Sequence, residues 1–294
     1  MALQIAIYSR TIDAEHKDLL QHFFAELIVK NITPIIWQPF YEQIKDTITF
    51  ATTPLTYNNA SNLSSPCECL VSLGGDGTML DAVTLVQNKG IPILGINFGR
   101  LGFLANIGNT QITEALTNLI NHSFVTDNRT LIHLDANIPL FDNVAYALNE
   151  FAIHKQDVSS MIKIHTYLNG EFLNTYWADG LIVATPTGST GYSLSCGGPI
   201  VFPDSGSIVI TPVAPHNLNL RPIIIPDSSV LSFEVEGRAD SYICALDARR
   251  EVVSMRTQLA VRKEDFTVNL LRLNENNFLQ TLRTKLLWGF DKRN

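Results

Sequence analysis

The stretch Cys67-Glu-Cys-Leu-Val-Ser-Leu73, followed directly by Gly74-Gly-Asp-Gly-Thr78, decides the fold of this chain. The first seven residues are typical of a buried strand, and apolar residues recur with helical spacing from Thr78 to Asn88. A glycine turn between a strand and a helix lets the backbone approach a ligand, and it points the free amides of the first helical turn at that ligand. We therefore expect a phosphate-binding turn at the carboxyl end of a parallel sheet.

Strands and helices alternate on both sides of this turn. Apolar runs predict further strands, and apolar residues at helical spacing predict further helices: strands at 3–8, 32–37 and 91–96, and helices at 13–31, 40–50 and 110–121. The polar segment 51–66 is expected to be a connection. The alternation predicts an α/β domain with a doubly wound parallel sheet over residues 1–125.

The pattern changes after about residue 125. Between 129 and 273 apolar residues alternate with period two, and Asn169-Gly170 between two such runs is a strong hairpin signal. This predicts an antiparallel, β-rich and sandwich-like domain over residues 126–273. Residues 275–288 return to helical spacing, so we expect a helix within the segment 274–294 to pack back on the body of the protein.

Composition excludes some functions and partners. Charged residues make up 17% of the 294 residues, the formal net charge is −7, and no basic run is longer than Arg249-Arg250. Duplex nucleic acid needs a clustered basic surface, so we expect no nucleic-acid partner. The neutral surface that so few charges leave predicts a homodimer or a homotetramer.

The sequence also predicts where the protein works. The N-terminus lacks a basic start and a cleavage site, and no apolar run approaches the roughly 18 residues of a membrane span. We therefore expect a cytoplasmic protein with no membrane partner.

Asp76 is the unusual residue of the glycine turn. A carboxylate there would repel a phosphate unless it acts on a metal ion or on a proton, and no lysine stands in the turn to compensate. One hypothesis makes Asp76 a catalytic group, and the other makes it the N-cap of the following helix. The turn alone favours neither.

Two further segments carry polar groups that suit a nucleotide. From Asp179 an apolar strand leads into a loop of glycines, hydroxyls and one aromatic ring that ends at Pro199, and such a loop suits ribose and pyrophosphate. The alternative is an array of β-turns rich in glycine and serine. The pair Asn149-Glu150 can both donate to and accept from ribose hydroxyls or an adenine edge, although such a pair is often only solvated.

Together these segments resemble the NAD kinase family, also called ATP-NAD kinases, over nearly the whole chain. The matching motifs are Gly74–Thr78, Asn97-x-Gly-x-Leu-Gly-Phe-Leu104, Asn149-Glu150, Asp179–Pro199, Pro215-His-x-Leu-x-x-Arg-Pro222 and Lys285-x-x-Trp288. The resemblance implies an α/β domain followed by a β-rich domain. It also implies transfer of the ATP γ-phosphoryl group to the 2′-hydroxyl of the adenosine ribose of NAD, which gives NADP.

The resemblance also implies roles for individual residues. Asp76 would be the general base, Asn149 and Glu150 would bind the ribose and adenine side of NAD, and Asp179 would bind the nicotinamide end. The ATP phosphates, accompanied by a divalent ion that is expected to be Mg²⁺, would be held by Gly74, Gly75, Asp76, Gly77 and Thr78. The nucleotide pocket would be lined by Thr190, Gly191, Tyr192, Ser193, Leu194 and Ser195. No residue is assigned as a metal ligand.

The chain departs from the family pattern at three positions. Gly191 stands where an alanine is common, Arg249 stands where a glutamine is usual, and Trp177 stands where some relatives have a basic residue. Two alternatives stay open: a lipid or diacylglycerol kinase that shares the Asp76 turn, and a non-catalytic NAD-binding sensor. The acidic net charge and the absence of a basic amphipathic helix weigh against the lipid kinase.

Overall fold

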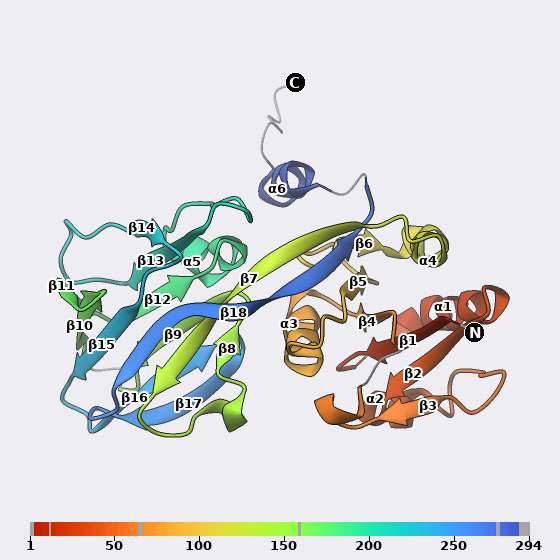
Figure 1. Ribbon diagram of the computed structural model, residues 1–294, viewed down its shortest axis with the longest axis horizontal. Coiled ribbons are helices and arrows are strands. Elements are labelled where there is room, and N and C mark those ends of the chain that lie inside the picture. Colours follow the sequence, from red (N-terminus) through yellow and green to blue (C-terminus); the bar gives the residue numbers. More distant parts are fainter. Residues whose placement is uncertain (1–2, 12, 64–66, 158–159, 275–276, 288–294) are drawn as a thin grey trace. The chain divides into compact units, whose positions relative to one another are not determined.

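A computed structural model describes residues 3–11, 13–63, 67–157, 160–274 and 277–287 (Figure 1). The chain divides into two compact units, one formed by residues 1–128 together with 268–294, and the other by residues 129–267. The segment 274–294, which the sequence sets apart, therefore belongs to the first unit.

The first unit is built on a parallel sheet in the order β5-β4-β1-β2-β3. Its strands are β1 (Leu3–Tyr8), β2 (Ile32–Trp37), β3 (Leu55–Tyr57), β4 (Cys69–Leu73) and β5 (Ile93–Asn97). The short strand β6 (Ile107–Gly108) and the end of β18 (Leu259–Arg272) also pair with β5. This order places the turn after β4 between the carboxyl ends of β5 and β1.

The α-helices in the described part of the first unit are α1 (Lys17–Val29), α2 (Gln38–Ile44), α3 (Asp76–Val86), α4 (Ile112–Ile120) and α6 (Phe278–Leu286). Four of these five helices bury two or more apolar residues each, and the fifth, α6, buries Leu282. In α1 the buried residues Leu20, Phe23, Phe24 and Leu27 follow the spacing of a single helical face. Among the described residues, no helix is long and apolar enough to cross a membrane.

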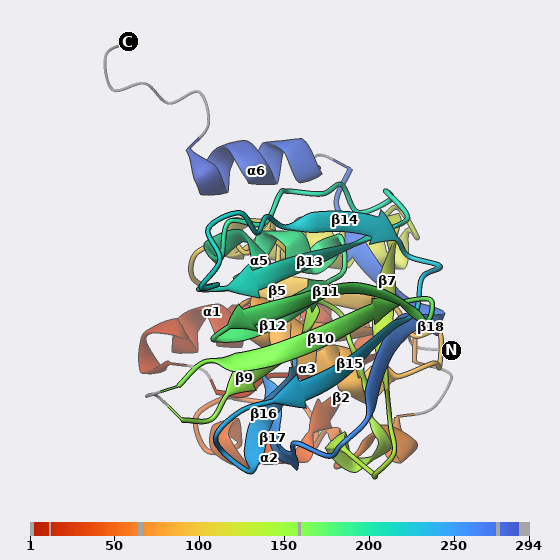
Figure 2. The same ribbon diagram turned by 90° about the vertical axis from the view of Figure 1, so that its left-hand side faces the viewer.

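The second unit consists of two antiparallel sheets. One has the order β11-β10-β15-β18, with β7 paired to β18 and β8, and the other has the order β14-β13-β12-β9-β16-β17. Figure 2 shows β11, β10 and β15 side by side. One apolar cluster, including Phe151 and Tyr242 of one sheet and Ile164 and Phe233 of the other, joins the two sheets into a sandwich.

The bounds of these elements follow the strand and turn signals. The strands are β7 (Val125–Ala136), β8 (Tyr146–Ala147), β9 (Glu150–Lys155), β10 (Ile162–Leu168), β11 (Glu171–Ala178), β12 (Gly180–Ala184), β13 (Ser207–Val213), β14 (Ile223–Pro226), β15 (Leu231–Glu236), β16 (Ser241–Leu246) and β17 (Arg249–Ser254). The helix α5 (Tyr192–Ser195) is a single turn. The hairpin predicted at Asn169-Gly170 joins β10 and β11, and both residues have positive φ.

The predicted fold class is confirmed, but several details were wrong. The segment 51–66 is not only a connection, because β3 pairs there with β2, and Tyr57 is buried with its hydroxyl donating to the Ile7 carbonyl. The last strand, β18, is 14 residues long and runs from Leu259 to Arg272. The terminal helix covers Phe278–Leu286, while 275, 276 and 288 of its predicted range lie outside the described residues.

Candidate active site

The glycine turn lies between β4 and α3, as predicted. Gly74 has φ of +148°, and a Cβ on this residue would overlap the Thr78 hydroxyl, so only glycine fits. Gly75 is the N-cap of α3 and supplies no side-chain bond to the helix. The amide of Thr78 donates to the Gly75 carbonyl at 3.0 Å, so the amides of Asp76 and Gly77 are the ones left for a ligand.

The Asp76 carboxylate is turned toward a neighbouring loop. Its Oδ2 accepts from the amide of Phe103 at 2.8 Å, and its Oδ1 accepts from those of Leu104 and Ala105 at 3.0 Å each. The N-cap hypothesis is wrong in its geometry, since Gly75 occupies that position and Asp76 is the first residue of the helix. A carboxylate has about four acceptor positions, so three bonds leave room for one more donor.

The loop that holds Asp76 is the motif Asn97-x-Gly-x-Leu-Gly-Phe-Leu104. The Asn97 side chain fixes its first turn, donating to the Arg100 carbonyl at 2.7 Å and accepting from the Gly99 amide at 2.9 Å. A Cβ on Gly102 would overlap the Asp76 Oδ1. The backbone of this motif, together with Ala105, therefore holds the Asp76 carboxylate in place.

In the second unit, a buried carboxylate positions the Asn149-Glu150 pair. Asp247 accepts from the amides of Leu148, Asn149 and Glu150 at 3.0, 2.8 and 3.1 Å. Burial raises the pKa of Asp247, and these three amides act in the opposite direction. Sequence reasoning missed Asp247 because it lies nearly a hundred residues from its partners.

Arg249 supports the same segment from another side. Its guanidinium donates to the carbonyls of Val144 and Tyr146 and lies over the ring of Phe141, 5.7 Å from the centroid. Arg249 therefore contacts the backbone of the segment 144–146, which leads through β8 to Asn149.

Glu150 is a partly buried acid whose Oε2 atom is buried and has no hydrogen-bond partner within the described part of the chain. Burial, and next the nearby Asp247, raise the pKa of Glu150 to about 8. A buried oxygen without a partner is costly, which makes this atom a natural acceptor or donor for a ligand hydroxyl.

The hydroxyl-rich loop after β12 packs directly on this pair. The Thr185 amide donates to the Asn149 carbonyl at 2.8 Å, and a Cβ on Gly188 would overlap that carbonyl. A Cβ on Gly191 would lie 3.2 Å from the Glu150 Oε2. Two segments that the sequence singled out are therefore brought together.

Tyr192 and Asp179 lie beside this loop. The Tyr192 ring is 39% exposed and lies 5.6 Å from the ring of His154, whose pKa is lowered by burial. Asp179 forms an ion pair of 2.6 Å with Lys155, the residue after His154. An exposed aromatic ring, a partly buried imidazole and an ion pair thus surround the loop.

The other residues of the predicted pocket lining differ in exposure. Ser193 is fully buried, and its hydroxyl bonds to that of Thr211 at 2.8 Å, so its role is in packing. The Thr190 hydroxyl donates to the Thr187 carbonyl at 3.2 Å. Leu194 is partly buried and Ser195 exposed, both on α5. Trp177 is exposed and stacks on His216, with ring centroids 4.5 Å apart.

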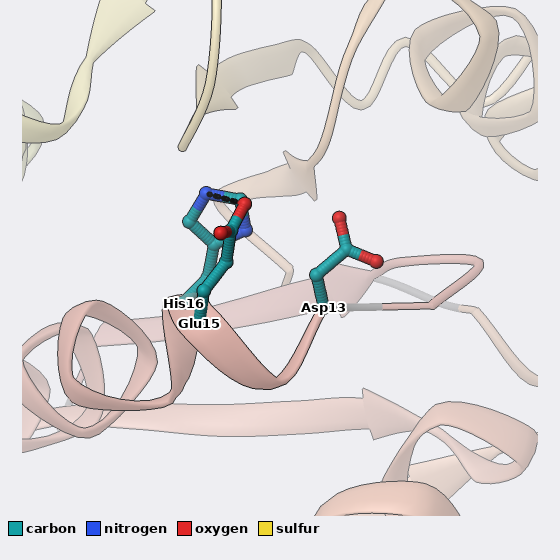
Figure 3. Close-up of side chains that lie close together, drawn as sticks. All are labelled: Asp13, Glu15 and His16. Atoms are coloured by element: carbon teal, nitrogen blue, oxygen red, sulfur yellow. Dashed lines mark ion pairs between the residues drawn. The ribbon is translucent and has the colours of Figure 1, made fainter.

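One group of possible metal ligands occurs among the described residues. Figure 3 shows Asp13, Glu15 and His16, whose ligand atoms lie within 4.8 Å of one another. Both carboxylates are exposed, and the dashed line marks the 3.9 Å ion pair of His16 with Glu15. Exposed acidic groups are common without an ion, so we assign no metal to this cluster.

Comparison with solved structures agrees with the fold. The yeast NADH kinase complexed with NADH has a TM-score of 0.88 at 22% identity, covering 98% of this chain and 88% of that one. The NAD kinase from Archaeoglobus fulgidus in complex with ATP has a TM-score of 0.74 at 22% identity, covering 97% and 99%.

Sequence comparison identifies the family. Residues 25–124 match the ATP-NAD kinase N-terminal domain, and residues 148–273 match the ATP-NAD kinase C-terminal domain. The NAD kinase of Cytophaga hutchinsonii is 46% identical over 98% of this chain and 99% of its own length. The NAD kinase of Flavobacterium psychrophilum is 44% identical over 99% of this chain and all of its own length. This chain belongs to the NAD kinase family.

Proposed function

We propose that this protein transfers the γ-phosphoryl group of ATP to the 2′-hydroxyl of the adenosine ribose of NAD, giving NADP and ADP. The observation that carries the proposal is the Asp76 carboxylate, held by three backbone amides at the start of the helix that follows the glycine turn. A hydroxyl acceptor needs a group that takes its proton, and Asp76 keeps an acceptor position for that purpose.

In this reaction the 2′-oxygen forms a bond to the γ-phosphorus while the bond from phosphorus to the oxygen of the β-phosphate breaks. Asp76 takes the proton of the hydroxyl, and ADP leaves with the electron pair of the broken bond. The ATP phosphates lie at the turn of Gly74, Gly75, Gly77 and Thr78, where the amides of Gly75 and Gly77 donate to them. The amides of Gly74 and Thr78 already donate to the carbonyls of Ile96 and Gly75. Alignment and charge neutralisation provide most of the acceleration of such reactions.

Mg²⁺ neutralises charge on the transferring phosphates when it is bound. The residues at the turn fit an ion that arrives with ATP, because Asp76 is the single carboxylate of the turn and three of its acceptor positions are occupied. Mg²⁺ usually keeps several waters and binds through substrate phosphates, so a cage of protein ligands is not required.

The second unit binds NAD in this proposal. Asn149 and Glu150 bind the ribose and adenine side. Glu150 Oε2, for which the described residues offer no partner, gains one from NAD. Asp179 binds the nicotinamide end, and Tyr192 lies against a base. Thr190, Gly191, Leu194 and Ser195 line the same pocket. A cytoplasmic location stays a prediction.

One assay tests the proposal. The purified protein is incubated with ATP, Mg²⁺ and NAD, and NADP is measured with a dehydrogenase that does not use NAD. We expect NADP with Mg²⁺, none in excess chelator, and recovery when Mg²⁺ is restored. Full turnover in chelator would contradict the metal requirement.

The same assay separates the alternatives. A folded protein that binds NAD but forms no NADP would be a sensor and not a kinase. Phosphorylation of diacylglycerol in place of NAD would indicate a lipid kinase.

A further inference from the structure

Arg10 lies beside the glycine turn in the first unit, although it is far from the turn in the sequence. It follows β1 directly, and β1 pairs in parallel with β4, with Tyr8 opposite Ser72. The chain therefore leaves β1 and β4 at the same edge of the sheet, with Arg10 after one strand and Gly74 after the other.

The backbone at Arg10 is tied to the start of the turn. The buried Ser9 hydroxyl donates to the carbonyl of Leu73 at 2.7 Å, one residue before Gly74. The Gln43 side chain donates to the Arg10 carbonyl at 3.1 Å. These bonds fix the position from which the Arg10 side chain extends.

The guanidinium is oriented by Asp81, which lies on α3. Arg10 donates to the two Asp81 oxygens through Nε and Nη2, the second bond measuring 2.7 Å. The Tyr8 hydroxyl also donates to Asp81, at 2.9 Å. This bidentate contact holds the planar guanidinium in one orientation.

In this orientation the remaining nitrogen faces the glycine turn. A Cβ on Gly77 would lie 3.5 Å from Nη1 and 3.9 Å from Cζ of Arg10. Among the described residues, acceptors are found for Nε and Nη2 of Arg10 but not for Nη1. The side chain is 48% exposed, so a ligand can reach it.

We propose that Arg10 is the cationic phosphate contact of the ATP subsite, with Nη1 donating to a phosphate oxygen that also contacts the first-turn amides of α3. The proposal rests on the proposed function. Asp81 balances the charge of Arg10, so Arg10 contributes a directed donor and little net charge. The turn itself contains no lysine or arginine, and Arg10 supplies a guanidinium donor to it from the segment after β1.

Steady-state kinetics of Arg10→Gln test this role. We expect the KM for ATP to rise about 10- to 100-fold, the range for a lost hydrogen bond to a charged group, while the KM for NAD stays within about twofold. Arg10→Lys keeps the positive charge but lacks the planar guanidinium with its fixed donors. Its KM for ATP should therefore rise less than that of Arg10→Gln. The matched control is Arg262→Gln, which removes a partly exposed arginine that pairs with an aspartate in the second unit. It should leave both KM values unchanged.

Binding measurements separate a phosphate contact from a purely structural ion pair. We expect Arg10→Gln to weaken ATP binding and to leave adenosine binding unchanged. Equal loss for ATP and adenosine, or a rise in the KM for NAD alone, would overturn the proposal. So would an unchanged KM for ATP in a variant whose thermal melting shows it to be folded.

Failure of the proposed function would look different. If the proposed function were wrong, the unsubstituted protein would form no NADP. The binding of ATP and of adenosine to the unsubstituted protein and to Arg10→Gln would still show whether Arg10 contacts a phosphate.

Discussion

At the scale of single residues, the Asp76 carboxylate accepts hydrogen bonds from the loop 103–105 and is also the proposed general base. In Asp76→Asn one carboxylate oxygen becomes an NH₂ group, which then faces an amide donor of the loop 103–105. We expect a loss of about 1–3 kcal/mol in the free energy of unfolding. We also expect kcat to fall about 10²- to 10⁴-fold, because the amide cannot take the hydroxyl proton. Denaturant unfolding and kcat of the folded protein measure the two effects.

The control for Asp76→Asn is Asn97→Ala. It removes the bonds that fix the same loop and leaves the carboxylate in place. Its kcat should fall far less than that of Asp76→Asn. A folded Asp76→Asn protein with kcat within about threefold of the unsubstituted enzyme would rule out the general base.

Glu150 gives a prediction about pH. Its pKa of about 8 lies above its ordinary value of 4.5, so between these pH values the folded chain binds a proton that the unfolded chain has lost. The stability from this group is fully present below pH 4.5 and is lost as the pH rises through 8, by at most about 1.4 kcal/mol per pH unit. We expect Glu150→Gln to unfold with a flatter dependence on pH over this window.

Glu150→Gln should also weaken NAD binding about ten- to a hundredfold while leaving ATP binding intact. Titration with NAD and unfolding from pH 5 to 9 check both effects. Glu171→Gln removes an exposed carboxylate on β11 and should change neither. A Glu150→Gln protein that matches the unsubstituted one in both measurements would remove Glu150 from the site.

At the scale of elements, the loop from Asn97 to Ala105 should tolerate a methyl group at one glycine and not at another. In Gly102→Ala the new Cβ overlaps Asp76 Oδ1, so the carboxylate or the loop must move. We expect a loss of about 1–3 kcal/mol in unfolding free energy and a fall in kcat similar to that of Asp76→Asn.

Gly99→Ala is the matched control in the same loop, since its Cβ would meet nothing closer than 3.7 Å, the Asn97 Oδ1. It should keep kcat and stability near those of the unsubstituted enzyme. Equal effects of the two substitutions would mean that the loop matters as a whole and that contact with Asp76 is not the cause.

The sequence predicts most elements because their signals are local. Helical spacing identifies α1 through Leu20, Phe23, Phe24 and Leu27, and Asn169-Gly170 marks the hairpin of β10 and β11. The strand β3 was missed because it is three residues long and only Tyr57 in it is buried.

Contacts between distant residues could not be predicted from spacing. Asp76 meets amides 27 to 29 positions away, Asp247 meets amides 97 to 99 positions away, and Arg10 pairs with Asp81 across 71 positions. Sequence motifs supplied the polar residues that we propose for the site. The fold alone shows which backbone groups and side chains hold them in place.

At the scale of the whole molecule, we predict a homo-oligomer. Charged residues make up only 17% of the chain, and β11 is the edge of its sheet with two large exposed apolar side chains, Phe172 at 57% and Trp177 at 46%. An edge strand with exposed apolar residues tends to pair or pack with another chain.

Light scattering should give a mass above that of one chain across a dilution series, and the double substitution Phe172→Lys with Trp177→Lys should lower that mass. Val29→Lys changes a 79% exposed apolar residue at the end of α1 and should not lower the mass. A monomer mass that does not change with dilution would refute the prediction.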